Sequence, residues 1–308
     1  MLKFIVRRVF WTIPVLLVVI FLTFIMMRQI GGNPFRQSER AVPEAVQRNL
    51  EAKFHVNDPW YLQYAYYVKG VFTFDLGPSL VVRGRDVNDI VKTHFPKSIE
   101  LGVYAFLFAL VLGVPLGMIA ALRHNTWVDY SAMFVSNVFH AVPSFLVATL
   151  LIYFVALKAG WVPTSGWTSW EHKILPSIAL GFGPMALFAR LVRGTMLETL
   201  QQDYVRTARA KGLRYRRVVG LHVLRNSLIP VVTAAGPLLG FIITGSFVIE
   251  LIFNIPGIGQ NYVDSISNRD YSVVMGLTVL LSVIVILANL VVDILYGILD
   301  PRTRDARS

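Results

Sequence analysis

Long stretches of apolar residues constrain this chain more than any other feature of its sequence. The first, from Val9 to Met27, contains no charged residue, and as a helix it would rise about 28 Å, close to the thickness of a bilayer core. Only 15% of the residues are charged, well below the roughly 25% usual for soluble proteins. Five more apolar segments lie at residues 99–122, 130–157, 174–191, 228–253 and 273–299. The sequence therefore predicts an all-α membrane protein with six transmembrane helices.

Two of these segments admit another interpretation. The first follows basic residues and could be a cleaved signal peptide, but its apolar run exceeds the about 7 to 15 residues usual there and continues into RQIGGNP. The fourth contains Pro184 and ends in Arg190 and Arg193. A tilted or kinked helix that lies within protein rather than lipid is therefore an alternative to a plain transmembrane helix here.

Arginine and lysine residues indicate the orientation of the chain in the membrane. If the N-terminus is inside, sixteen of them fall on that side, whereas the short outer loops hold only Lys158, Lys173 and Arg269. The first outer loop is longer than the about 60 residues within which such charges count. We therefore expect both termini to be cytoplasmic.

This topology divides the chain into expected regions. They are residues 1–29 for the cytoplasmic N-terminus and first transmembrane helix, 30–98 for an extracytoplasmic loop region, 99–301 for a core of five transmembrane helices with a cytoplasmic loop near 192–227, and 302–308 for a cytoplasmic tail. Within the outer region, PEAVQRNLEAKF from Pro43 predicts a short amphipathic helix. The aromatic stretch DPWYLQYAYYVKGVFTFDLG suits a segment at the membrane interface or over the outer mouth of a pathway.

The sequence lacks the common signatures of enzymes. With no cysteine, it can form no disulfide, thiolate metal site or cysteine nucleophile. It contains no Walker A pattern for ATP, no HExxH pair for a metalloprotease and no GxSxG elbow for a hydrolase. We therefore expect a non-catalytic chain that binds no cofactor or metal.

Four ionisable side chains lie within or near the apolar segments, where such groups are the default candidates for function. Glu100, Glu250 and Asp293 are near segment ends, which favours interfacial placement or helix capping over a proton relay. His140 lies in the middle of the third segment, where a hydrogen-bonded packing residue is the plainer interpretation. A proton-coupled carrier would be expected to pair its buried ionisable groups, and no pair is visible in the sequence.

Prolines are expected to interrupt four of the apolar segments. They are Pro115, Pro143, Pro184 and Pro237. Such interruptions suit a bundle that lines a route better than a membrane anchor whose helices all face lipid. The candidate pathway or packing residues are therefore His140, Pro143, Pro184 and Pro237. Two glycine pairs, in GVPLG from Gly113 and GPLLG from Gly236, would let helices of this bundle approach closely.

A strongly basic segment, YVRTARAKGLRYRRVVGLHVLRNSLIP, runs from Tyr204 to Pro230 with seven arginines and lysines and no acidic residue. Nucleic-acid binding, membrane orientation and docking of a partner protein could each explain it, given the net charge of +11. Nucleic acid is disfavoured because the basic residues cluster at the predicted cytoplasmic face of the membrane. Gly212 separates good helix formers from LRYRR, which predicts a short helix, a turn and a second short helix.

The first of these short helices is expected to have two distinct faces. Arg206 and Arg209 lie three residues apart and share one face, while Val205 and Ala208 share another. The small residues Ala208 and Ala210 would let the helix enter a groove without steric clash.

The order of small residues and glycine in RTARAKG resembles the cytoplasmic signature loop of binding-protein-dependent ABC importer permeases, which reads Glu-Ala-Ala, three residues, then Gly. Aligned on Gly212, the pattern falls on Arg206, Thr207 and Ala208, so Arg replaces Glu and Thr replaces the first Ala. RTARAKGL resembles the peptide and nickel branch of these permeases. MLKFIVRRVF, DPWYLQYAYYVKGVFTFDLGPSL, FNIPGIGQ and LDPRTR resemble the B-type permease subunit of dipeptide and oligopeptide importers over essentially the whole chain.

The resemblance implies the transmembrane domain of a type I ABC importer, with six transmembrane helices, in the cytoplasmic membrane of a prokaryote. The implied partners are a second homologous permease subunit, two cytoplasmic ABC ATPase subunits, an extracytoplasmic substrate-binding protein, a peptide substrate and membrane lipid. ATP and Mg²⁺ are expected on the ATPases rather than on this chain.

The resemblance also implies that the first short helix is a coupling helix seated in a cleft on one ATPase. The coupling loop comprises Arg206, Thr207, Ala208, Arg209, Ala210, Lys211 and Gly212. Gly212 would supply the turn, Ala208 and Ala210 the close fit, and the three basic residues contacts to acidic groups of the ATPase.

Two alternatives remain open from the sequence. The same class of importer could move nickel, glutathione or haem instead of peptides. A chain from another functional class could be a membrane anchor or assembly subunit without a translocation pathway of its own.

Overall fold

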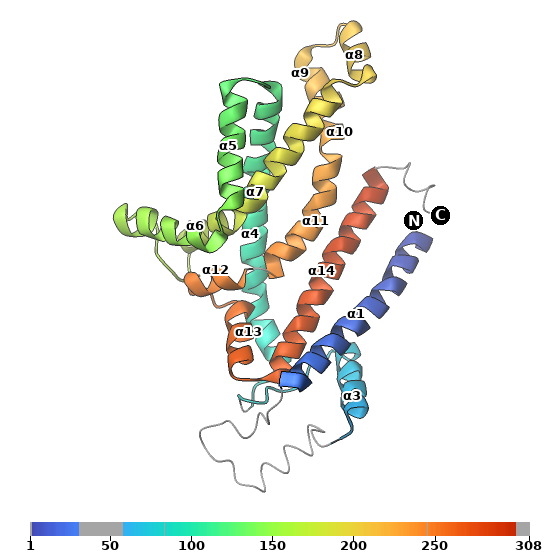
Figure 1. The fold of residues 1–308 in the computed structure, drawn as a ribbon, viewed down its shortest axis with the longest axis vertical. Coiled ribbons are helices and arrows are strands. Elements are labelled where there is room, and N and C mark those ends of the chain that lie inside the picture. Colours follow the sequence, from blue (N-terminus) through green and yellow to red (C-terminus); the bar gives the residue numbers. More distant parts are fainter. Residues whose placement is uncertain (1, 31–57, 83, 245, 300–308) are drawn as a thin grey trace. The chain divides into compact units, whose positions relative to one another are not determined.

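The computed structural model describes residues 2–30, 58–82, 84–244 and 246–299, and the elements of these residues are helices apart from one isolated β-bridge (Figure 1). The predicted all-α class is therefore confirmed. The chain divides into two compact units. One contains Ile99–Ile255 and the residues from Leu287 onward, and the other contains Leu2–Ser98 and Pro256–Ile286.

The unit that begins at Leu2 includes two packed helices, α1 (Leu2–Ile30) and α3 (Trp60–Phe72). The hydroxyl of Tyr64 on α3 donates a hydrogen bond of 3.1 Å to the carbonyl oxygen of Leu17 on α1. The Tyr64 ring also contacts the rings of Phe21 and Phe24, with centroids 5.5 and 5.7 Å away. The aromatic stretch predicted for the outer region therefore packs against the first apolar helix. The amphipathic helix predicted from Pro43 lies outside the described residues.

Polar side chains of the same unit hold its two chain segments together. Asp270 caps α14 (Tyr271–Leu299) and accepts hydrogen bonds from the Ser79 hydroxyl and, at 3.1 Å, from the backbone N–H of Leu80. The Nδ1 of His94 lies 3.0 Å from the carbonyl oxygen of Pro256, which can only accept, so Nδ1 carries the proton. The His94 contact therefore holds Pro256 of the FNIPGIGQ motif in place, two residues before the helix α13 (Ile258–Ser267) begins.

The larger unit contains the remaining helices. In chain order they are α4 (Val87–Leu122, from Ile99 onward), α5 (Trp127–Ala141), α6 (Ser144–Leu151), the π-helical η2 (Ile152–Lys158), α7 (Glu171–Leu200), α8 (Asp203–Ala210), α9 (Tyr215–Arg217), the π-helical η3 (Val218–Leu224), α10 (Arg225–Ser227), α11 (Ile229–Thr244) and α12 (Phe247–Ile252). Many of the buried apolar residues described in this unit belong to two clusters, and α7 contributes to both.

Glycines allow the backbones of α4 and α7 to approach very closely. A Cβ atom built at Gly117 of α4 would lie 2.3 Å from the carbonyl oxygen of Ala189 of α7, and one at Gly113 would lie 2.6 Å from that of Met185. Side chains larger than hydrogen are therefore excluded at both positions. The close approach predicted from GVPLG is confirmed, and α7 is half buried in its apolar window, whereas α4 and α14 are one-third buried. The prediction that the fourth segment lies largely within protein is consistent with this burial.

The observed helices differ in length and continuity from the predicted apolar segments. Three of the described helices are long and apolar enough to cross a membrane, or up to five spans if each of two bent helix pairs counts as one. The second segment starts at Val87 rather than at residue 99, because the helix continues upstream into the predicted outer region. The fifth is preceded by Tyr215–Ser227, which makes a 44° bend with the helix that begins at Ile229, and the latter ends at Thr244. The six-helix count and the cytoplasmic termini stay predictions.

Only one of the four prolines expected to interrupt a segment ends a helix. Between α5 and the segment Ser144–Lys158 the chain bends by 103°, and Pro143 directly precedes the second helix after an extended Val142. This matches the preference of the residue before proline for extended backbone. The helices α4, α7 and α11 instead continue through Pro115, Pro184 and Pro237, so the expected interruptions there are wrong.

The glycine contact between α4 and α7 predicts a large difference between two identical substitutions. Gly117→Ala forces the Cβ against the backbone of α7 and should destabilise the folded protein by about 1–3 kcal/mol. Gly194→Ala on α7 meets nothing within 4 Å and should be neutral or stabilising by up to about 1 kcal/mol. Thermal unfolding of the detergent-solubilised protein would compare the two, and equal midpoints would show that the close approach is not essential.

Candidate functional site

The predicted coupling loop folds as a short helix, a tight turn and a second short helix. After α8, Gly212 has a φ of +78°, which only glycine adopts without strain. Its N–H donates to the carbonyl of Arg209 at 2.9 Å, and the N–H of Leu213 donates to that of Ala208 at 3.4 Å. These two bonds form a Schellman motif, the common way of ending a helix at glycine. The predicted helix, turn and helix are confirmed, with Gly212 at the turn.

The two predicted faces of α8 have opposite environments. Val205 and Ala208 are 0% and 6% exposed, and they belong to the same buried cluster as Val192 and Met196 of α7. Ala208 therefore packs against its own chain, and the expectation that it gives a close fit to a partner needs correction. Among the small residues of α8, Ala210 is the one exposed to solvent in the single chain.

The exposed face of α8 presents basic side chains. Arg206, Arg209 and Lys211 are all exposed. The guanidinium of Arg209 lies 5.5 Å from the ring centre of Tyr215 on α9, whereas Arg206 makes only a 3.7 Å ion pair with the exposed Asp203 one turn away. Exposed pairs of this kind contribute roughly 0–1 kcal/mol. These cations are therefore available to acidic groups of another molecule.

Hydrogen bonds connect α8 and α10 to the end of α7. Asn226 of α10 donates to the hydroxyl of Tyr204 at 3.0 Å, and the hydroxyl of Ser227 donates to that of Thr199 at 3.2 Å. The Thr195 hydroxyl of α7 donates to the carbonyl of Ser227 at 2.9 Å. Together with the buried cluster, these bonds make α8 and the end of α7 a single packed assembly.

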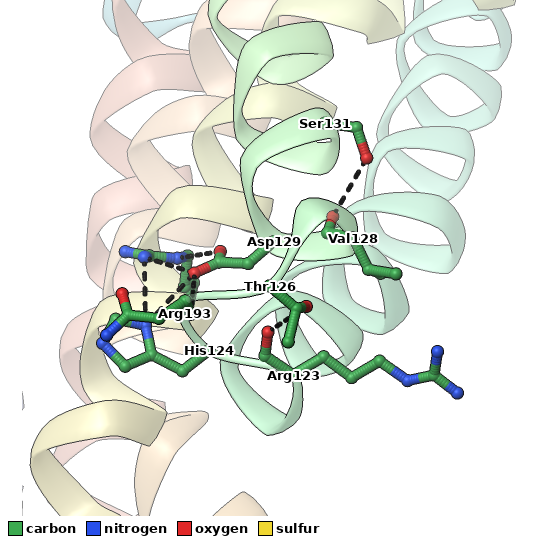
Figure 2. Close-up of polar contacts among 8 residues, drawn as sticks. Arg123, His124, Thr126, Val128, Asp129, Ser131 and Arg193 are labelled. Atoms are coloured by element: carbon green, nitrogen blue, oxygen red, sulfur yellow. Dashed lines mark hydrogen bonds and ion pairs between the residues drawn. The ribbon is translucent and has the colours of Figure 1, made fainter.

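A buried ion pair lies beside this assembly and was not identified from the sequence. Asp129 of α5 is fully buried and receives two hydrogen bonds from Arg193 of α7, at 2.6 and 2.8 Å (Figure 2). The backbone N–H of Asn125 also donates to it at 3.1 Å, and Nδ1 of His124 lies 3.1 Å away. The pair therefore joins α5, the turn that precedes it, and α7. Both residues lie at predicted cytoplasmic ends of apolar segments, which is the signal that could have indicated their proximity.

A cavity of about 420 Å³ lies at the bend between α5 and α6. Its lining residues come from that bend, from α7 and from α11: Phe139, His140, Val142, Pro143, Ser144, Val147, Ala179, Leu180, Phe182, Gly183, Pro184, Leu187, Leu238, Phe241 and Ile242. Of the candidate pathway residues, His140, Pro143 and Pro184 line it. Pro237 does not, although its neighbour Leu238 does. The cavity is largely apolar, and its open side makes it a candidate binding surface.

The histidine of this cavity is not the packing residue that the sequence favoured. His140 is exposed in the single chain and, within the part of the chain that the structure describes, its side chain makes no hydrogen bond. An exposed imidazole at the cavity wall can offer a hydrogen-bonding group to a ligand.

The other ionisable candidates have structural partners. Glu100 accepts hydrogen bonds from Lys173 and, at 2.9 Å, from the indole of Trp167, so it joins α4 to the start of α7. Glu250 is fully buried in α12 rather than interfacial and accepts a 2.6 Å bond from Ser246. The side chain of Asp293 lies outside the described residues. Among the residues with described side chains, no group of three or more His, Asp or Glu could hold a metal ion.

Comparison with known families gives two matches that together span most of the chain. Residues 113–305 match the family described as the binding-protein-dependent transport system inner membrane component. Residues 1–101 match its N-terminal companion.

Curated relatives match over nearly the full length. The dipeptide transport system permease protein DppB of Bacillus subtilis is 48% identical over 305 residues, which cover 99% of this chain and 98% of the relative. The oligopeptide transport system permease protein OppB of Salmonella typhimurium is 46% identical over 306 residues, which cover 99% of this chain and all of the relative.

The fold is similar to that of a solved transporter. A chain of the methionine ABC transporter MetNI, in inward-facing conformations, aligns with a TM-score of 0.58 at 19% identity, over 68% of this chain and 96% of that one. At this identity the likeness shows the fold alone. The chain therefore belongs to the family of binding-protein-dependent transport system inner membrane components, and it is a multi-pass membrane protein with the transmembrane fold of type I ABC importers.

Proposed function

We propose that this chain forms, with a second homologous permease subunit, the pathway that carries di- and oligopeptides across the cytoplasmic membrane of a prokaryote. Two cytoplasmic ATPases that bind ATP and Mg²⁺ would drive the transport, and an extracytoplasmic binding protein would deliver the peptide. Relatives named for dipeptide and oligopeptide transport, at 44–48% identity over the whole chain, favour peptides over nickel, glutathione or haem. The cavity beside a bent helix favours a translocating subunit over a membrane anchor.

The observation that carries this proposal is the two-sided packing of α8. One face, with Val205 and Ala208, is fixed in the core of the chain, while the other presents Arg206, Arg209 and Lys211. A helix that is anchored in this way can transmit a displacement to the end of α7 instead of absorbing it. We therefore assign the residues from Arg206 to Gly212 to ATPase coupling. Ala208 acts there by holding α8 to its own chain, whereas Ala210 and the basic residues meet the ATPase.

The coupling assignment predicts a strong effect of charge reversal on α8. Arg206→Glu together with Lys211→Glu should weaken association with the ATPases at least about tenfold and abolish most peptide uptake, because like charges would face each other. Lys158→Glu, also an exposed reversal but in η2 on the predicted outer side, is the control. Co-purification of the ATPases and uptake of a labelled dipeptide measure both effects. Wild-type association in the double variant would refute the assignment.

Gly212 offers a second test of the same segment. Gly212→Val places a β-branched residue at a φ of +78°, which costs about 1–3 kcal/mol of local strain, although no atom lies within 4 Å of the added Cβ. We expect the turn to reorganise and uptake to fall while the transporter still assembles in the membrane. Gly220→Val in η3, which also has open space but no positive φ, is the matched control. Equal uptake by the two variants would show that the turn is not needed.

We also propose that the cavity is part of the peptide pathway. His140 and Ser144 are the polar groups on its wall that can donate or accept hydrogen bonds with a peptide backbone. The apolar remainder of the wall suits transit of varied side chains without selecting among them.

Filling this cavity should block transport. Gly183 lines it and has no atom within 4 Å of a Cβ, so Gly183→Leu should cost a bound peptide about 1–3 kcal/mol and lower uptake roughly five- to hundredfold. Gly194→Leu, on the same helix with equal space but outside the cavity, is the control. Uptake of labelled dipeptide, with nickel, glutathione and haem as competitors, reports pathway and cargo together. Competition by one of these three instead of by peptides would overturn the peptide assignment.

A further inference from the structure

The bidentate ion pair between Asp129 and Arg193 is largely shielded from water. Its carboxylate is fully buried, and the Arg193 side chain is only 26% exposed. Replacing a buried ion pair by well-packed apolar residues is often neutral or stabilising, so the need for stability alone does not explain the pair. Such a pair instead holds the two helices that carry it in one defined relative geometry. The planar guanidinium binds the carboxylate through two parallel hydrogen bonds, which restrict its orientation.

The pair defines the geometry of three chain segments at once. Asp129 belongs to the first turn of α5, and it accepts hydrogen bonds from Arg193 of α7 and from the backbone of Asn125 in the turn after α4. Nδ1 of His124 lies 3.1 Å from the carboxylate and 3.3 Å from Nη2 of Arg193 (Figure 2). The described donors to this carboxylate therefore come from α7 and from the turn before α5. As long as these hydrogen bonds stay intact, α7 and this turn must move together with α5.

The same part of α7 holds α8. Val192 and Met196, on either side of Arg193, are fully buried in the cluster that contains Val205 and Ala208 of α8. A displacement of α8 therefore reaches Arg193 through direct packing. From Asp129, α5 continues for about 16 Å to His140 at the cavity, at ~1.5 Å per residue. The residues of α7 at the cavity, such as Gly183 and Pro184, belong to the same helix as Arg193.

We propose that Asp129 and Arg193 are positioning residues that make α5 move together with α7 when an ATPase displaces α8. This inference rests on the proposed transport function. With the pair intact, both walls of the cavity shift as one body. Without it, α7 moves past α5, and ATP hydrolysis no longer produces a matching change at the cavity.

The test is the number of ATP molecules hydrolysed per peptide transported, in the complete transporter reconstituted with its binding protein. Asp129→Asn removes the charge with little change in shape, and Arg193→Lys keeps the charge but loses the fork. Both should raise the ratio roughly two- to thirtyfold, the range expected for changes in coupling. Glu100→Gln, the same carboxylate-to-amide change in the partly exposed contact of α4 with the start of α7, should leave the ratio unchanged.

A distance measurement separates loss of coupling from loss of folding. The chain has no cysteine, so spin labels can be attached at Phe134→Cys on α5 and Glu198→Cys on α7, which are both exposed. In Arg193→Lys the distance distribution between these labels should broaden relative to the doubly labelled parent, whereas in Glu100→Gln it should not.

The outcomes distinguish this inference from the function on which it rests. An unchanged ATP-to-peptide ratio in assembled variants, or an equal rise in Glu100→Gln, would overturn the positioning role while wild-type transport continued. Failure of both Asp129→Asn and Arg193→Lys to assemble would make the pair a folding element and overturn the role as well. A wild-type complex that transports no peptide would overturn the proposed function, and the inference with it.

Discussion

The close approach of the α4 and α7 backbones is the constraint on which the larger unit depends. Gly113 and Gly117 leave room for carbonyl oxygens of α7 that a single methyl group would occupy. Such contact brings many atoms within van der Waals distance and fixes α7 laterally, and it uses no polar side chain at the two glycines. Because α7 is fixed in this way, the features that it carries are fixed too: one wall of the cavity, the arginine that binds α5, and the buried surface that holds α8.

The sequence predicted the helices well and their continuity poorly. Apolar composition decides that a segment is helical when its backbone groups must bond internally, which is why the apolar segments became helices. Proline content does not decide where such a helix breaks. Pro143 follows an extended Val142 and starts a new helix, whereas α7 accommodates Pro184 without ending. The missing N–H costs little where neighbouring groups compensate, and those neighbours belong to distant parts of the chain.

The proposed coupling segment, Arg206 to Gly212, shows the same difference between what local sequence determines and what distant contacts determine. The turn at Gly212 was predictable because a positive φ is a property of one residue and its neighbours. The role of Ala208 was not, since a small residue fits equally well against its own core and against a partner. The pair of Asp129 and Arg193 was missed because 64 residues separate its members, and each alone resembles an ordinary charge at the end of an apolar segment.

The two ends of α7 are held by interactions of different kinds. Near Glu171 the contact of Lys173 with Glu100 leaves both side chains 24–34% exposed, where water weakens the attraction and allows alternative geometries. Near Leu200 the carboxylate of Asp129 is inaccessible to water, so its fork with Arg193 must break completely before α5 and α7 can separate. The tightly held end is the one that adjoins α8, and under the proposed function it is where the displacement produced by an ATPase would enter the chain.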